Sequence, residues 1–237
     1  MSNRIKKELL AVIPARGGSK RVHKKNIKLL GNKPLVSWAI DSAKDSDAID
    51  EILVSTDSIE ILEICKSTGY LNNYVRPANL ATDTANQFLV MQHAIEHYLA
   101  NGVEFKNIVL LQPTSPFRTG ELIDRAYQEF KKKKCDALIS VTLSDTPRQW
   151  TNFLPEDNSL ANFIDERYIG KQSQELGKTY KFDGSLYFYN VKRLLKEKKL
   201  IFKNNIYAFI LQGHESLDID NQLDLDFANF LIKSKNV

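Results

Sequence analysis

Short runs of apolar residues alternate along this chain with amphipathic stretches of helical period, and this alternation constrains the fold more than any other feature. The apolar runs are predicted strands at residues 9–15, 51–57, 107–113, 136–143, 185–190 and 205–211. The amphipathic stretches are predicted helices at residues 34–46, 59–70, 84–100, 119–134, 191–199 and 221–234. Strands without a polar face belong to a parallel sheet that helices cover on both sides. We therefore expect an α/β fold with a mostly parallel central sheet and helices on both faces.

The rhythm changes at about residues 145–182, where the chain is polar, contains proline and lacks periodic apolar runs. Strand character resumes directly afterwards, so this stretch is interpreted as an excursion from the sheet and not as a separate domain. A length of 237 residues also fits one sizeable domain. We expect a single domain over residues 1–237 that carries this excursion.

Composition excludes several classes of protein. Hydrophobic residues make up 43% of the chain and charged residues 26%, which is enough apolar content for a core and argues against disorder. Two cysteines, Cys65 and Cys135, are too few for a disulfide scaffold or a cysteine-rich zinc module, and they favour a reducing, cytoplasmic location. Since no apolar run approaches the length of about 18 residues that a membrane-spanning helix needs, we expect no membrane partner.

The net charge of +4 is a small excess of basic residues. It is too small to predict nucleic-acid binding, and it fits an anionic small-molecule substrate equally well. The four consecutive lysines at 131–134 are interpreted as the solvated end of a helix, where positive charge is favourable. We therefore expect no nucleic-acid partner.

Polar motifs follow the first three predicted strands, at the edge of a parallel sheet where ligands bind. The first motif, PARGGSKRVHKKN at residues 14–26, is rich in basic residues and contains Gly17 and Gly18. Glycines allow main-chain N–H groups to point at phosphate oxygens, and Ser19 adds a hydroxyl donor. The motif is neither GxxxxGK[ST] nor GxGxxG, which disfavours a P-loop ATPase and a dinucleotide-binding dehydrogenase. A solvated basic loop is the alternative interpretation.

Five motifs together resemble one enzyme family. They are PARGGSK with KKN five residues later, VSTD (54–57), RPANLATDTA (76–85), LLQPTSPFRT (110–119) and SLDID (216–220). In this order and spacing they resemble the CMP-sugar synthetases, the cytidylyltransferases that activate sialic acid and related nine-carbon (nonulosonic) acids. The resemblance implies a Rossmann-like nucleotidyltransferase fold, release of pyrophosphate from CTP with Mg²⁺, and a homodimer formed through the excursion.

The resemblance also assigns residues to the nucleotide. Phosphates and ribose would be held by Arg16, Gly18, Ser19, Lys20, Lys25 and Asn26, with the cations Arg16, Lys20 and Lys25 also serving catalysis. Cytosine would lie near Arg76, Ala85 and Gln87, where a cationic donor and an amide can contact a pyrimidine edge. An ordinary helix start is the alternative for this second segment, with Thr82 and Asp83 as caps.

Two carboxylates, Asp218 and Asp220, lie two residues apart in the segment ESLDID. On an extended segment this spacing places both on one face, and one or two carboxylates suit Mg²⁺. Acidic residues also gather at helix N-termini, and Asp220 is a candidate cap of the helix that follows. The resemblance favours the metal interpretation, with both residues catalytic.

Candidate sugar-binding residues are Gln112, Arg167, Lys171, Tyr180 and Asp183. Gln112 ends a buried strand, where its amide offers a donor and an acceptor to a hydroxyl group. The others lie where the family contacts its sugar, but this chain departs from the family there. Lys171 stands in place of an arginine, and Asp183 in place of an asparagine. A lysine cannot make the bidentate contact of an arginine with a carboxylate, so Arg167 is a candidate to replace it.

Three alternatives stay open at this point. The chain could activate an eight-carbon octulosonic acid, or use another nucleotide as a sugar-phosphate nucleotidyltransferase. From another class, it could be a nucleotide-binding relative that has lost catalysis, which the altered sugar segment leaves open. The intact pair Asp218 and Asp220 favours an active enzyme.

Overall fold

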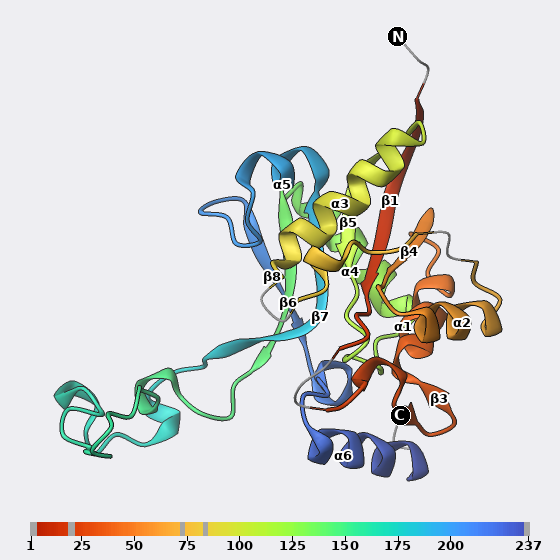
Figure 1. Cartoon of the computed structure of the whole chain (residues 1–237). Coiled ribbons are helices and arrows are strands. Elements are labelled where there is room, and N and C mark those ends of the chain that lie inside the picture. The colour runs from red at the N-terminus through yellow and green to blue at the C-terminus, as the bar shows by residue number, and fades with distance from the viewer. Residues whose placement is uncertain (1–3, 19–21, 72–73, 83–84, 235–237) are drawn as a thin grey trace.

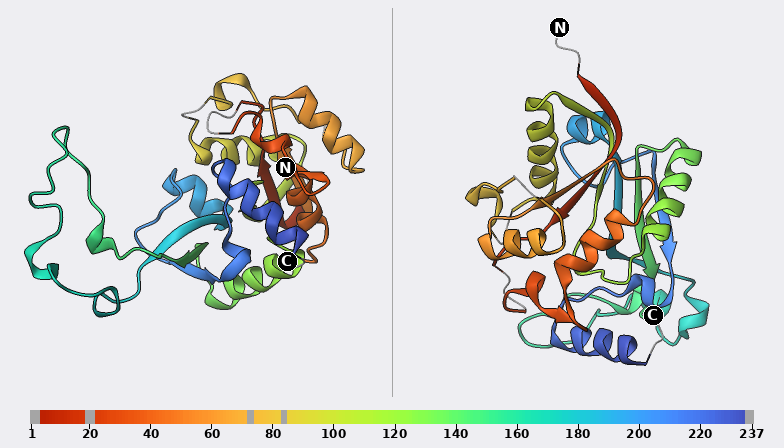
Figure 2. Two further views of the ribbon diagram at one scale, coloured as in Figure 1. Left: turned by 90° about the horizontal axis from the view of Figure 1, so that it is seen from below. Right: turned by 90° about the vertical axis from the view of Figure 1, so that its right-hand side faces the viewer.

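The structure is a computed structural model that describes residues 4–18, 22–71, 74–82 and 85–234. Over these residues the chain forms a central sheet of six strands (Figures 1 and 2). They are β1 (Ile5–Pro14), β4 (Glu51–Ser55), β5 (Val103–Leu110), β6 (Ala137–Leu143), β7 (Tyr180–Asn190) and β8 (Ile206–Leu211). Their order across the sheet is β4-β1-β5-β7-β6-β8.

Strand β7 determines which parts of the chain meet at the site. β1 pairs in parallel with β4 and β5, and β6 pairs in parallel with β8. β7 lies between β5 and β6 and is antiparallel to both. Its first residues therefore lie at the same edge of the sheet as the last residues of the parallel strands. The expected mostly parallel α/β sheet is confirmed, with this antiparallel strand inserted.

Helices cover both faces of the sheet, as predicted. They are α1 (Leu35–Lys44), α2 (Ile59–Ser67), α3 (Gln87–Ala100), α4 (Gly120–Lys133), α5 (Val191–Glu197) and α6 (Gln222–Lys233). Successive strand residues point to opposite faces. Leu9 and Ala11 therefore pack with α1, α2 and α4, whereas Leu10 and Val12 pack with α3 and α5. Short 3-10 helices occupy Lys25–Ile27, Ala78–Leu80, Arg148–Trp150, Glu166–Tyr168, Ser173–Glu175 and Gly213–Ser216.

A third, smaller core anchors the segment that carries the predicted metal ligands. A hairpin of β2 (Leu29–Leu30) and β3 (Lys33–Pro34) lies beside α6. Leu30, Leu225 and Ala228 pack there around Ile219, which is fully buried. Burial of Ile219 fixes the backbone between Asp218 and Asp220.

Several element boundaries differ from the predictions. β5, for example, spans Val103–Leu110 and not 107–113. α3 begins at Gln87 and not at Thr84, because Asn86 caps it by accepting a hydrogen bond from the Phe88 N–H at 2.9 Å. The proposed caps Thr82 and Asp83 are therefore wrong, with Asp83 itself outside the described residues. β7 begins at Tyr180, five residues before the predicted strand. Its polar first half lacks the apolar run from which a strand was predicted.

The segment between β6 and β7 leaves the sheet as an extended arm (Figure 1). Every residue from 151 to 180 is described, and none of them is buried. Large apolar side chains on the arm are exposed, among them Phe153 at 96%, Leu154, Leu160 and Ile169. The arm thus has no core of its own.

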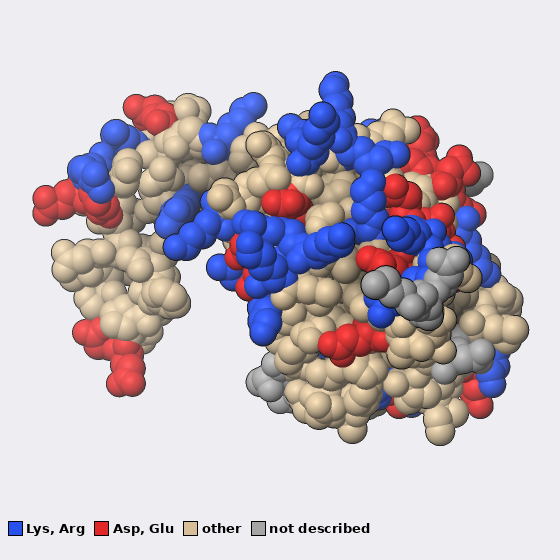
Figure 3. Space-filling view, turned by 90° about the horizontal axis from the view of Figure 1, so that it is seen from above, with Lys and Arg blue, Asp and Glu red and all other residues tan. Residues whose placement is uncertain are grey.

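Two further expectations concern the surface and the cysteines. Across the described ranges, no helix combines the length and apolar character that crossing a bilayer requires. Lys131–Lys134 are exposed at the end of α4. In the view from above, Lys and Arg side chains gather in a band across the middle of the molecule, with acidic side chains beside it (Figure 3). Cys65 and Cys135 are buried free thiols, and burial raises the pKa of each to about 11.

Candidate active site

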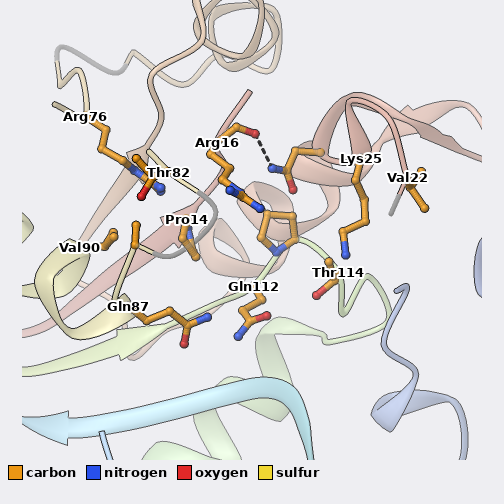
Figure 4. A pocket seen from close by; sticks show the side chains of 13 residues that line it. Pro14, Arg16, Val22, Lys25, Arg76, Thr82, Gln87, Val90, Gln112 and Thr114 are labelled. Atoms are coloured by element: carbon orange, nitrogen blue, oxygen red, sulfur yellow. Dashed lines mark hydrogen bonds between the residues drawn. The ribbon is translucent and has the colours of Figure 1, made fainter. Parts of the chain in front are cut away.

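A pocket of about 520 Å³ opens at the carboxyl ends of β1 and β5 (Figure 4). We call it the strand-end pocket. It is lined by Pro14, Arg16, Val22, Lys25, Asn26, Arg76, Thr82, Ala85, Gln87, Val90, Gln112, Pro113 and Thr114. Most of the predicted nucleotide residues that the structure describes lie in this wall, together with Gln112. Residues up to 100 positions apart in sequence meet here because parallel strands end at a common edge.

The loop after β1 is held in shape by side chains around it. Asp57, the last residue of the VSTD motif, accepts a hydrogen bond from the Gly17 N–H at 2.9 Å. Asn26 donates from Nδ2 to the Arg16 carbonyl at 2.9 Å, the dashed line in Figure 4. A Cβ atom at Gly17 would lie 3.0 Å from the Cβ of Ser58, so the glycine allows this close approach. VSTD therefore supports the basic loop.

Lys25 joins the basic loop to the acidic segment. Its Nζ donates to the Ile219 carbonyl at 2.9 Å and lies 3.3 Å from Asp220 Oδ1. Asp220 does not cap the last helix. Asn221 does, by accepting from the Asp224 N–H, and Asp224 in turn accepts from the N–H groups of Asp220 and Asn221. The capping interpretation of Asp220 is therefore wrong, and its carboxylate faces the lysine of the basic loop.

Arg76 lies in the wall of the strand-end pocket, but its nitrogens bond to the protein. Nε donates to Ser55 Oγ at 2.9 Å, Nη2 to the Ser55 carbonyl at 2.6 Å and Nη1 to the Leu80 carbonyl at 3.4 Å. Burial lowers the pKa of Arg76. The residue ties the end of β4 to the loop that leads to Ala85, so its geometry is that of a clamp on the pocket wall.

Two amides face the interior of the strand-end pocket. Gln87 is the first residue of α3, and Gln112 follows the end of β5. Figure 4 shows both side chains directed into the same space. Ala85 is small and lies on the same wall. Together these residues offer donors and acceptors beside an open face, which suits a planar base.

A second cavity, of about 910 Å³, lies between the start of β7, the end of β8 and the segment before α6. We call it the acidic pocket. It is lined by Thr142, Leu143, Asp145, Lys178, Tyr180, Lys181, Phe182, Asp183, Ile210, Leu211, Gln212, Gly213, Ser216, Leu217, Asp218, Asp220 and Asp224. The structure thus brings predicted sugar residues, Tyr180 and Asp183, next to the predicted metal pair. The antiparallel direction of β7 is the reason.

Asp218 is the more deeply placed carboxylate of the pair. Burial, followed by the charge of Asp220, raises its pKa to about 6. Its Oδ1 is buried and has no hydrogen-bond partner within the described part of the chain. A carboxylate that is costly to ionise and has an unpaired oxygen fits a cation ligand.

The candidate metal ligands at this site are the two carboxylates Asp218 and Asp220. The described residues contain no group of three or more His, Cys, Asp or Glu side chains placed to hold a metal ion. Mg²⁺ commonly binds one or two carboxylates and completes its shell with phosphate oxygens and water. The residues present therefore fit Mg²⁺ that is bound together with a nucleotide.

Arg118 and Asp183 are buried between the two pockets, with 2% and 3% of their surfaces exposed. The charge of Asp183 acts on the buried guanidinium of Arg118. Asp183 lines the acidic pocket, yet its Oδ1 accepts bonds from Ser140 Oγ and the Ser185 N–H. It is thus oriented into the protein, which disfavours the predicted sugar contact.

Arg167 and Lys171 lie on the arm and line neither pocket. Arg167 forms an exposed bidentate pair with Asp165, with Nη2 2.7 Å from Oδ2. The Lys171 Nζ lies 5.5 Å from the centre of the Tyr168 ring. The structure therefore does not bring these two cations to the site of the same chain.

The residues predicted to hold phosphates and ribose also include Gly18, Ser19 and Lys20. Ser19 and Lys20 lie outside the described residues. Gly18 is described and exposed, and it does not line the strand-end pocket.

The structure also adds residues that the sequence did not single out. Val22, Thr82, Val90 and Thr114 line the strand-end pocket. Thr114 follows a strand end, which was the available signal for it. Val22 and Val90 carried none, because an apolar side chain in a pocket wall has the same pattern as one in the core.

A basic loop and a carboxylate pair at one edge of a mostly parallel sheet define an α/β nucleotide-binding protein of nucleotidyltransferase type. Residues 10–236 match the cytidylyltransferase family. The chain belongs to this family, as the sequence motifs predicted.

Its relatives are similar along its whole length. The chain is 36% identical over 224 residues to a pseudaminic acid cytidylyltransferase of Campylobacter jejuni, covering 94% of this chain and 96% of that protein. It is 34% identical over 232 residues to an N-acylneuraminate cytidylyltransferase of Escherichia coli, covering 97% of this chain and 53% of that protein. A solved structure of CMP:2-keto-3-deoxy-manno-octonic acid synthetase with CTP shares the fold, with a TM-score of 0.69, 15% identity, and coverage of 97% of this chain and 100% of that chain.

Proposed function

We propose that this protein joins CTP to a nine-carbon α-keto sugar acid and releases pyrophosphate. The observation that carries the proposal is the contact of Lys25 with Asp220, which places a cation of the basic loop beside the carboxylate pair. The two pockets meet at this contact. The names of the relatives that match at 34–36% identity support a nonulosonic acid over an octulosonic acid.

The chemistry is an in-line displacement at phosphorus. The anomeric hydroxyl oxygen of the sugar acid forms a bond to the α-phosphorus of CTP, the bond to pyrophosphate breaks, and the hydroxyl proton passes to solvent. Arg16, Ser19, Lys20, Lys25 and Asn26 hold the phosphates and ribose. Their contribution is positioning and neutralisation of charge, as in phosphoryl transfer generally.

The two substrates contact different residues of the pocket walls. Gln87 and Ala85 contact the cytosine, and Arg76 keeps their loop in place through Ser55 and Leu80. Gln112 lies between the nucleotide and the sugar, and Tyr180 borders the sugar side.

Asp218 and Asp220 are the residues that would hold Mg²⁺. The ion would neutralise charge that develops on the phosphate oxygens. The buried, unpaired Oδ1 of Asp218 supports this role over a cap or a surface acid.

Pyrophosphate release from CTP tests the function. The purified protein is assayed with Mg²⁺ and, one at a time, sialic, legionaminic, pseudaminic and octulosonic acids. Release with a nine-carbon acid supports the proposal. Faster release with the octulosonic acid would favour the eight-carbon alternative, and absence of release with every acid would favour a catalytically inactive nucleotide-binding protein.

We also propose a homodimer formed through the arm. Its exposed apolar side chains, with Tyr180 and Phe182 at its base, are the kind of surface that a second chain covers. Light scattering at micromolar concentration should report twice the chain mass of 27.1 kDa. A species of the mass of one chain would contradict the dimer.

In the proposed dimer, Lys171 on the arm of one chain is expected to contact the sugar carboxylate in the active site of the other chain. Lys171→Ala should raise the KM for the sugar acid more than the KM for CTP, because a cation that meets the sugar carboxylate does not touch the nucleotide. Steady-state kinetics with each substrate varied in turn measures both constants. Lys196→Ala, at an exposed lysine of α5 that lines neither pocket, serves as the comparison. An equal rise of both KM values for Lys171→Ala would exclude the role.

A further inference from the structure

The strands β5, β6 and β7 separate between the two pockets. The last backbone pair of β5 with β7 joins Leu110 to Tyr187, and two residues further along this register Gln112 would lie opposite Ser185. In its place the Arg118 Nη1 donates to the Gln112 carbonyl at 3.1 Å and to the Ser185 carbonyl at 3.0 Å. The guanidinium thus replaces backbone hydrogen bonds where the two strands diverge.

On its other side β7 bulges away from β6. The register shifts between Ile139, which pairs with Tyr187, and Val141, which pairs with Phe182, so Asp183 to Leu186 bulge out of the ladder. Asp183 closes this bulge: its Oδ1 accepts from Ser140 Oγ and from the Ser185 N–H at 2.8 Å. Bulges of this kind redirect residues next to active sites.

The bulge turns Gly184 toward the predicted metal pair. Gly184 has a φ of 82°, and a Cβ atom there would lie 3.4 Å from Asp218 Oδ2. The loop that carries Arg118 reaches the same pair by a second route, because the Thr114 carbonyl accepts from the Ile219 N–H at 2.8 Å. Arg118 and Asp183 therefore hold the two backbone segments that carry Gln112 and Gly184. The Thr114 carbonyl links the first of these segments to the one that carries Asp218.

Burial of these two charged side chains has a desolvation cost that an apolar core would avoid. Arg118 Nε and Nη2 and Asp183 Oδ2 are buried without a hydrogen-bond partner over the described ranges. Burial lowers the pKa of Arg118, while the charge of Asp183 opposes that shift. The two side chains interact through their charges. Apolar side chains of similar volume often stabilise a fold as well as buried opposite charges do. A requirement for defined geometry explains why these two charged side chains are buried between the pockets.

We infer that Arg118 and Asp183 are a buried positioning pair that fixes the strand-end pocket and the acidic pocket relative to each other. The inference rests on the proposed function, because bond formation needs the α-phosphorus in one pocket and the sugar hydroxyl in the other to stay in line. Misplacement by about 1 Å can reduce a rate on the order of 10²-fold without loss of binding.

The test compares Arg118→Met, Asp183→Asn and the double variant with the wild type. Arg125→Met is the control, because Arg125 pairs with Glu215 on the surface at 2.9 Å and lies outside both pockets. For each protein we would measure the melting temperature, the number and affinity of CTP sites by calorimetry with Mg²⁺, and kcat for CMP transfer.

Each single variant should lower the melting temperature by leaving one buried charge uncompensated, and the double variant should lose less than the sum of the two. The double variant should bind CTP with wild-type stoichiometry and similar affinity, yet its kcat should stay on the order of 10²-fold low. The control should match the wild type in all three measurements.

Three results would overturn the inference. If the double variant kept wild-type kcat, the two side chains would contribute only to packing. If kcat fell in proportion to the number of CTP sites, the loss would be due to misfolded protein. The melting temperatures need no activity: strictly additive losses would refute the pairing, even if no acid proved to be a substrate. Failure of the proposed function is thus distinguishable from failure of the pair.

Discussion

Asp218→Asn should reduce the turnover of CMP transfer on the order of 10²-fold or more, while it makes the ligand-free protein more stable at pH 7. The loss of turnover follows from the loss of one of two carboxylates that would hold Mg²⁺. The gain in stability follows from the site itself, since burial and the charge of Asp220 raise the pKa of Asp218 from 3.8 to about 6. Asparagine keeps the shape and has no charge to desolvate.

The sign of the pH dependence is fixed by this shift. Between pH 4 and 6 the folded protein holds a proton on Asp218 that the unfolded chain has released, so the free energy of unfolding falls as the pH rises through this window. Above it the cost is constant, at most about 3 kcal/mol for a shift of this size. The variant should therefore gain about 1–3 kcal/mol at pH 7, which corresponds to several degrees in melting temperature.

Thermal denaturation from pH 4 to 8 without divalent ions measures this difference. The variant and the wild type should melt alike near pH 4 and diverge up to about pH 6. Asp226→Asn is the control. Asp226 is exposed on α6, does not line the acidic pocket, and accepts a hydrogen bond from Gln222 at 2.9 Å. An Asp218→Asn protein that retains wild-type turnover at saturating Mg²⁺ would remove the metal role.

Arg76→Met should destabilise the protein and weaken CTP binding together. Arg76 is buried, and the variant loses its three hydrogen bonds to Ser55 and Leu80. Hydrogen bonds of charged groups contribute about 1.5–3 kcal/mol each, and part of that is returned by removing a buried cation. We expect a net loss on the order of 2–4 kcal/mol in the free energy of unfolding.

Urea denaturation and CTP titration measure the two effects. The KM for CTP should rise more than the KM for the sugar acid, because Arg76 holds the loop of Ala85 and does not reach the acidic pocket. Arg125→Met again provides a surface arginine of the same size. If Arg76→Met kept wild-type stability and lost only CTP affinity, Arg76 would be a direct ligand of the base and not a clamp.

Much of the fold was predictable because its signals are local. Thr119 is of a residue type that caps helices, and its hydroxyl accepts from the Leu122 N–H at 3.1 Å. The strand predicted at 107–113 was found because it is an apolar run bounded by turns, although the observed strand β5 is Val103–Leu110. The start of α3 was misplaced, because Thr82, Thr84 and Asn86 are all acceptable caps by residue type, and packing selected Asn86.

The candidate site was predictable where motifs follow parallel strands. Arg16, Lys25 and Gln112 meet in one pocket because parallel strands end at one edge of the sheet. Asp183 was interpreted as a sugar ligand, since the sequence shows neither the bulge that buries it nor Arg118 nearby. Arg167 and Lys171 were grouped with the sugar site, but they project on the arm.

The sequence by itself determined the α/β fold, the family, and the two ends of the chain that carry the chemistry, the basic loop at 14–26 and the carboxylates at 218 and 220. These features depend on apolar periodicity and on motifs of a few adjacent residues. The tertiary structure alone decided that β7 enters the sheet antiparallel, that Lys25 meets Asp220, and that Arg118 lies buried near Asp183. The physical reason is that pairing direction, burial and the contact of distant charges are properties of the packed chain, which no short stretch of residues specifies.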